Sequence, residues 1–188
     1  MRVADGDGMN RQTGVRVSSP VQGMKISRLS NTVASVSYDI YFLKRDPGQS
    51  WEDAMEALEE QAAAPEVLTR PSCWDQVVSG VRYILGDVSV LENPPVWEVD
   101  HERTGIQVSC FSREWSITVP YWSDGDAAVA ITGHLRAIAG IVQTATGLEA
   151  YDPQVEIAVT TDEWTAQQAA SVFDQVAESF DARGMRRG

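Results

Sequence analysis

His101 and Cys110 are the two side chains in this sequence whose types and spacing best suit nucleophilic chemistry. A two-residue turn at Thr104 and Gly105 would pair the flanking strands and bring the imidazole and the thiol to the same face of a sheet. A catalytic cysteine–histidine pair also needs a third group that orients the imidazole. The acidic residues on either side of His101 point to the opposite face, so we favour a buried thiol beside a half-buried imidazole.

Metal and nucleotide motifs give no better candidate. The two histidines and two cysteines have none of the paired spacings of a metal site. Asp124-Gly125-Asp126 resembles the start of a calcium loop, but no glutamate follows at the required spacing, and carboxylates also suit the start of a helix. No glycine-rich nucleotide loop and no GxSxG motif occurs. We therefore assign no catalytic, cofactor-binding or metal-binding residue, expect no cofactor, and lean against an enzyme.

Asp39 is the carboxylate of most interest. Tyr38 and Ile40 flank it on an apolar strand, so we expect partial burial. A buried aspartate can act as a general base, although it more often pairs with a neighbour or caps a loop. Since no second carboxylate can be placed beside it, a small-molecule-binding protein or enzyme with a site near Asp39 and Tyr41 is the alternative function.

The charge of the chain is strongly negative and uneven. The net charge is -12, and residues 1–36 carry five basic against two acidic residues, so residues 37–188 carry -15. Such a surface repels phosphate backbones, and we expect no nucleic-acid binding. No run of about 18 apolar residues suggests a membrane span. The acidic surface favours a basic protein as partner, although it can also serve solubility alone.

Four residues form the expected partner-binding surface: Tyr121, Trp122, Asp124 and Asp126. Apolar residues alternate along the predicted strand up to Tyr121, so Trp122 should point to the opposite face, which predicts an exposed ring. A ring tucked under the loop fits the sequence equally well. Exposed aromatic residues beside charges are common interface anchors. The leading hypothesis is therefore a soluble, acidic protein-binding domain of the immunity or inhibitor type, whose oligomeric state the sequence does not reveal.

The elements that position these residues predict an α+β fold, with helices packed on one face of a mainly antiparallel sheet. Alternating apolar residues indicate the strands, and apolar residues spaced by three and four indicate the helices. Capping pairs at Ser50/Asp53, Ser72/Asp75 and Thr160/Glu163 predict three helix starts. The expected order is a strand over 37–43, helices after 50 and 72, strands over 96–102, 106–110 and 115–121, a helix from 123 or 124 to Gly147, a strand over 155–159 and a last helix.

The sequence divides into three parts. Residues 1–36 show no periodicity and are expected to be a disordered extension, which would arise from an over-long gene assignment if the natural start is Val36. Residues 37–182 form a single α+β domain, and residues 183–188 a frayed tail. Two cysteines without a secretory signal suggest reduced thiols in the cytoplasm.

Three segments carry a resemblance to a known family: 37–42 (SYDIYF), 104–109 (TGIQVS) and 147–154 (GLEAYDPQ). Over roughly residues 36–155 the chain resembles a family of small bacterial proteins that is common in actinobacteria and has no established activity. The resemblance therefore implies no catalytic residue. Endings like Tyr151-Asp152-Pro153-Gln154 also occur among suspected toxin-immunity proteins, which is consistent with a binding function.

Overall fold

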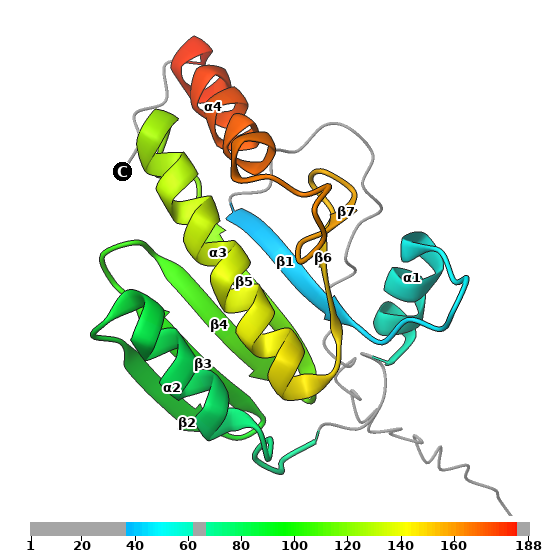
Figure 1. Ribbon diagram of the computed structural model, residues 1–188. Coiled ribbons are helices and arrows are strands. Elements are labelled where there is room, and N and C mark those ends of the chain that lie inside the picture. Colours follow the sequence, from blue (N-terminus) through cyan, green and yellow to red (C-terminus); the bar gives the residue numbers. More distant parts are fainter. Residues whose placement is uncertain (1–36, 62–66, 184–188) are drawn as a thin grey trace, which may run out of the picture. The chain divides into compact units, whose positions relative to one another are not determined.

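A computed structural model describes residues 37–61 and 67–183 (Figure 1). Within these ranges the chain forms four helices and a seven-stranded antiparallel sheet, so the predicted α+β class is confirmed. The expected extension 1–36 and most of the expected tail 183–188 lie outside the described residues.

The sheet has the strand order β2-β3-β4-β5-β1-β6-β7, and every neighbouring pair is antiparallel. The first strand of the chain therefore lies between β5 and β6, where both of its edges are paired. The strand bounds are β1 Ser37–Leu43, β2 Ser89–Asn93, β3 Val96–His101, β4 Ile106–Phe111, β5 Glu114–Pro120, β6 Glu149–Asp152 and β7 Ile157–Ala158.

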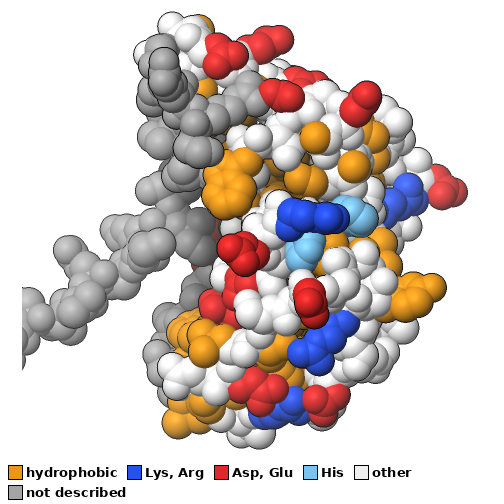
Figure 2. Space-filling model, turned by 90° about the vertical axis from the view of Figure 1, so that its left-hand side faces the viewer, with side chains coloured by type: hydrophobic (Ala, Val, Ile, Leu, Met, Phe, Trp, Pro, Cys, Tyr) orange, Lys and Arg blue, Asp and Glu red, His pale blue; other side chains and the backbone are white. Residues whose placement is uncertain are grey.

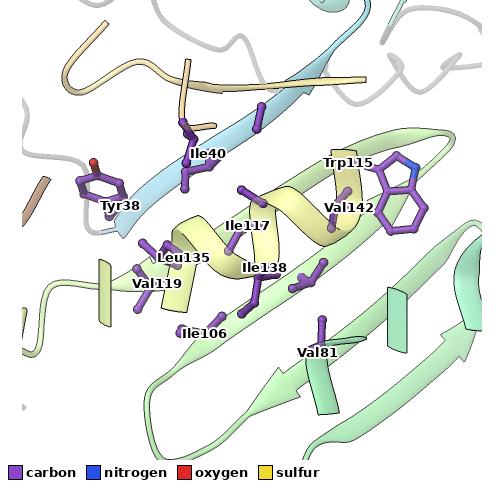
Figure 3. Packing of buried hydrophobic residues seen from close by; sticks show 14 of the residues in the cluster. Tyr38, Ile40, Val81, Ile106, Trp115, Ile117, Val119, Leu135, Ile138 and Val142 are labelled. Atoms are coloured by element: carbon purple, nitrogen blue, oxygen red, sulfur yellow. The ribbon is translucent and has the colours of Figure 1, made fainter. Parts of the chain in front are cut away.

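The main core lies between one face of this sheet and three helices. The buried and partly exposed residues alternate along β3, β4 and β5, as expected for strands with one apolar face. In Figure 3, side chains such as Ile117 and Val119 of the sheet meet Leu135 and Ile138 of the long helix. The helices that cover this face are α2 Trp74–Leu85, α3 Gly125–Thr146 and α4 Ala166–Ala182, and α3 runs roughly along the strands β4 and β5 (Figure 1).

The remaining helix, α1 Trp51–Gln61, packs in a second, smaller cluster. Its Trp51 ring stacks on the ring of Tyr151, with centroids 4.5 Å apart, and the Arg45 guanidinium lies 4.1 Å from the Trp51 centroid. Tyr151 pairs with Tyr41 in the β1–β6 ladder, and Tyr41 alternates with the core residues of β1. This cluster therefore lies on the side of the sheet that points away from the main core.

Several predicted helix ends are confirmed. The Asp53 amide donates to Ser50 Oγ at 3.1 Å, and α3 runs from an N-cap at Asp124 to Gly147, whose φ of +74° favours glycine. Two predicted starts were wrong. The N-cap of α2 is Cys73, and the N-cap of α4 is Thr165, which lies five residues after Thr160 and forms a capping box with Gln168.

The edges of the sheet also differ from the prediction. The sequence analysis missed β2, an edge strand whose largely exposed residues lack a regular alternation. Pro94 and Pro95 form the turn that joins β2 to β3. Of the expected strand over 155–159, only Ile157–Ala158 forms a strand, which lies at the edge of the sheet and pairs with β6.

Among the described helices, α3 alone is long and apolar enough to cross a membrane by length and composition. Its fully buried residues, among them Leu135, Ile138 and Val142, belong to the main core. Burial in the core therefore accounts for part of its apolar character.

Candidate functional site

The second face of the sheet, opposite the main core, carries most of the polar strand residues. We call it the polar face; its residues are partly exposed. Four of them are acidic, and the described strands contain no lysine or arginine. The polar face consists of Asp39, Tyr41, Glu98, Asp100, Gln107, Ser109, Glu114, Ser116 and Thr118.

A polar row crosses four strands at one end of this face. Asp39 accepts hydrogen bonds from Ser37 Oγ at 3.0 Å and from Thr118 Oγ1 at 2.8 Å. Thr118 pairs with Gln107 on β4, and Gln107 Nε2 donates to Asp100 Oδ1 at 2.9 Å. The row therefore has a carboxylate at each end, Asp39 and Asp100. Hydrogen bonds from Thr118 and Gln107 fix the orientation of these two carboxylates.

The next row combines one carboxylate with hydroxyl groups. Glu98 pairs with Ser109, whose hydroxyl lies 2.9 Å from that of Ser116, and Ser116 pairs with Tyr41 on β1. Burial raises the pKa of Glu98, and the negative charge of Asp100 raises it further. A positive group placed on this face would offset both effects.

Apolar side chains border the acidic residues at the β2 edge of the polar face and at the end opposite the polar row. Leu91 of β2 pairs with Glu98 and is 48 % exposed. Phe111 of β4 pairs with Glu114 and is 41 % exposed, and burial raises the pKa of the Glu114 carboxyl. The face thus offers acidic and apolar contacts side by side.

Trp122 stands at the end of the sheet nearest the polar row. Its indole is 59 % exposed, and its backbone amide donates to the Pro120 carbonyl at 2.8 Å. The ring lies against the β3–β4 turn, since a Cβ added to Gly105 would come within 3.0 Å of the indole and 2.8 Å of Pro120. Gly105 also has a φ of +71°, so this close approach depends on glycine.

The structure separates the four residues of the predicted partner surface. Tyr121 is 5 % exposed and packs edge-on against Phe173 with centroids 4.9 Å apart, so it belongs to the core. Asp124 and Asp126 are exposed at the start of α3. The first amide of this helix, that of Gly125, donates to Asp174 Oδ1 of α4 at 2.8 Å. The exposed part of the predicted surface is therefore Trp122 with the two aspartates.

The expected proximity of His101 and Cys110 was wrong. The turn between β3 and β4 takes four residues instead of two, so His101 pairs with Ile106 and Cys110 pairs with Trp97. His101 Nδ1 lies 2.8 Å from Thr104 Oγ1, and burial raises the pKa of the Cys110 thiol to about 12. A thiol of this kind is unreactive at neutral pH.

Asp39 and Tyr41 are neighbours on the polar face, as their alternation in β1 predicts. Burial raises the pKa of Tyr41, and the charges of Asp39 and Glu59 add to the effect. The Asp39 carboxylate is occupied by Ser37 and Thr118. This arrangement holds the carboxylate in place but adds no acid–base partner for it.

Asp152, which the sequence analysis did not single out, is the fully buried carboxylate of the described domain. It accepts hydrogen bonds from the hydroxyl of Tyr38, from Trp164 Nε1 at 2.7 Å and from the Gln154 amide at 3.0 Å. Burial raises its pKa, and the bonds from Trp164 and Tyr38 oppose the rise. The one sequence signal was its place in the Tyr151–Gln154 segment that carries the family resemblance.

A groove of about 380 Å³ lies between α2 and α3. The side chains that line the groove supply one amide and one hydroxyl as polar groups, and most of the other lining residues are small. The lining residues are Gln76, Gly80, Ala137, Gly140, Ile141 and Thr144.

In the part of the chain that the structure describes, no three His, Cys, Asp or Glu side chains lie close enough together to hold a metal ion. No family model, no curated protein and no solved structure matches this chain.

Proposed function

We propose that this chain is an acidic protein-binding domain that associates with a basic protein, in the manner of an inhibitor or immunity protein. The observation that carries the proposal is the sheet itself: its polar face presents four carboxylates, and its described strands hold no lysine or arginine. Figure 2 shows another side of the domain, where acidic, basic and apolar side chains are interspersed. The exclusion of positive charge is therefore a property of the sheet rather than of the whole surface.

The acidic field supports association more than it supports catalysis. Residues 37–188 carry a net charge of -15. Complementary charge speeds the encounter with a basic partner and rejects acidic ones. The exposed Trp122 supplies an apolar anchor beside this field, as aromatic residues do in many interfaces.

The alternative, a small-molecule or enzymatic site near Asp39 and Tyr41, has less support. Its carboxylate lies on a sheet face and is held by two hydroxyl groups, and catalytic acid–base work needs a partly free group beside a bound substrate. Asp39 serves the binding proposal directly, because a carboxylate fixed by hydroxyl donors is already oriented for a cation.

The test uses the full chain and two synthetic octapeptides, one alternating arginine with threonine and the other alternating glutamate with threonine. Calorimetric titration at about 50 mM and about 300 mM NaCl spans a marked change in the screening length. We expect the basic peptide to bind, the acidic peptide not to bind, and the affinity for the basic peptide to fall with salt. Absence of binding by the basic peptide, or equal binding of both peptides, would overturn the proposal.

A further inference from the structure

We infer that the basic partner docks on the polar face of the sheet, as an extended segment that carries arginine or lysine at alternate positions. The inference rests on the proposed function and names the surface and the chemistry of the partner. It goes beyond the helix-start surface of Trp122, Asp124 and Asp126 that the sequence predicts.

The spacing of the acidic side chains fits an extended segment. Glu98 and Asp100 occupy alternate positions of β3 and lie on the same face. Alternate residues of a strand lie roughly 6.6 to 6.8 Å apart, which is also the spacing of alternate side chains in any extended peptide. Two cations at positions i and i+2 of a partner segment can therefore face Glu98 and Asp100 together.

The hydrogen bonds of the polar row favour arginine in particular. Asp39 and Asp100 are fixed by Thr118 and Gln107, so a guanidinium meets carboxylates of defined orientation. Paired N–H donors of arginine suit such groups better than the single ammonium of lysine. The described strands around Glu98 contain no lysine or arginine, so the sheet itself offers this carboxylate no cation.

The borders of the face supply the apolar part of an interface. Leu91 is exposed at the β2 edge beside Glu98, and Phe111 is exposed at one end of the face beside Glu114. Trp122 is exposed at the other end, against the β3–β4 turn. A partner segment that covers the acidic rows thus gains apolar contact at both ends, and such contacts provide most of the binding energy of interfaces.

A second copy of this chain is a poor occupant of the same face. A twofold interface would bring the same four carboxylates of both copies together without a basic residue from either sheet. Like charges brought together in an interface cost several kcal/mol. Charge complementarity therefore selects a basic protein.

The test compares two charge-matched variants in the same calorimetric titration with the arginine–threonine peptide. The first removes the four charges of the polar face: Asp39→Asn, Glu98→Gln, Asp100→Asn and Glu114→Gln. The second removes four exposed charges on helix α4, which covers the opposite face of the sheet, and on the segment before it: Asp162→Asn, Glu163→Gln, Glu178→Gln and Asp181→Asn. Both variants have the same net charge, so any difference between them comes from position.

We expect the dissociation constant to rise at least about tenfold in the polar-face variant and less than about threefold in the control. The amides keep the oxygen atoms that accept from Thr118 and Gln107, and a thermal melt of each variant checks the fold. Should the fourfold variant not fold, Glu98→Gln with Glu114→Gln gives the same comparison against Glu163→Gln with Glu178→Gln.

The failures of the two proposals are distinguishable. Equal losses in both variants would mean that net charge alone attracts the peptide, which overturns the docking surface and leaves the basic partner in place. Binding that survives the polar-face variant and is lost with Asp124→Asn and Asp126→Asn would move the partner to the start of α3, again overturning the docking surface alone. Absence of binding by the unaltered chain overturns the proposed function itself.

Discussion

The hydroxyl of Tyr38 donates a hydrogen bond to the carboxylate of Asp152, which lies 114 positions further along the chain. The same carboxylate accepts from the indole of Trp164, just before α4. One buried group therefore joins β1, the end of β6 and the entry to the last helix. Because its donors are all supplied by the fold, this carboxylate can be buried without a cation nearby.

This network predicts that two substitutions, Tyr38→Phe and Asp152→Ala, lower the free energy of unfolding by different amounts. Tyr38→Phe removes one donor and leaves Asp152 with Trp164 and Gln154, so we expect a loss of about 1–3 kcal/mol. Asp152→Ala leaves two buried side-chain donors without an acceptor, and we expect about 2–5 kcal/mol. Urea unfolding of both variants provides the comparison. A smaller loss for Asp152→Ala than for Tyr38→Phe would show that the carboxylate does not hold the network together.

The two cysteines should remain free thiols of very different reactivity. Cys110 is fully buried and its pKa is raised to about 12, whereas Cys73 is only partly buried. In the native protein we expect an alkylating reagent at neutral pH to leave Cys110 unmodified, and both thiols to react after unfolding. Mass spectrometry of the products measures which cysteines are alkylated, and the Cys110→Ser variant serves as the reference. Modification of Cys110 in the folded chain at the rate of a free thiol would contradict its placement.

His101 should make the domain less stable as the pH falls. Burial lowers its pKa in the folded state, and the charges of Arg103 and His134 lower it further. The unfolded chain then takes up a proton near pH 6.5 before the folded chain does, so stability present above that pH is lost on acidification. We expect His101→Gln to lose less free energy of unfolding than the unaltered chain between about pH 7 and about pH 5. Identical slopes for the two proteins would refute this assignment.

Trp122 should matter for binding and little for folding. Because its ring is 59 % exposed, we expect Trp122→Ala to change the free energy of unfolding by less than about 1 kcal/mol and to weaken binding of the arginine–threonine peptide. Trp115→Ala is the matched control. That indole is 5 % exposed and lies 5.7 Å from the Trp74 ring, so its loss should cost about 3–5 kcal/mol. A large stability loss for Trp122→Ala, with any binding loss explained by unfolding, would make the residue structural.

Periodicity predicted the centre of the fold and failed at its edges. Strands β4 and β5 and helix α3 have regular apolar repeats, because each buries one face against the core. The edge strand β2 buries little and therefore has no such repeat. The His101–Cys110 pairing failed because the turn at Gly105 takes two residues more than expected, which shifts the register.

The candidate site was predictable only in part. Asp39 and Trp122 could be singled out from the local pattern, but the sequence fitted a buried Trp122 ring as well as an exposed one, and the structure decides for exposure. The row that joins Asp39 to Asp100 depends on the order of strands β1, β5, β4 and β3 in the sheet. Such pairing between distant segments leaves no mark in any one of them, so the polar face as a unit required the structure.

The most direct test of the account is a titration of the isotopically labelled full chain with the arginine–threonine peptide, followed by amide chemical shifts. The docking surface predicts that the largest changes fall on the polar face, at Asp39, Glu98, Asp100 and Thr118, and extend to Trp122. Addition of salt should reverse these changes as the charges are screened. Changes concentrated on the exposed acidic residues of α4 and the segment before it, with the polar face unaffected, would contradict the account.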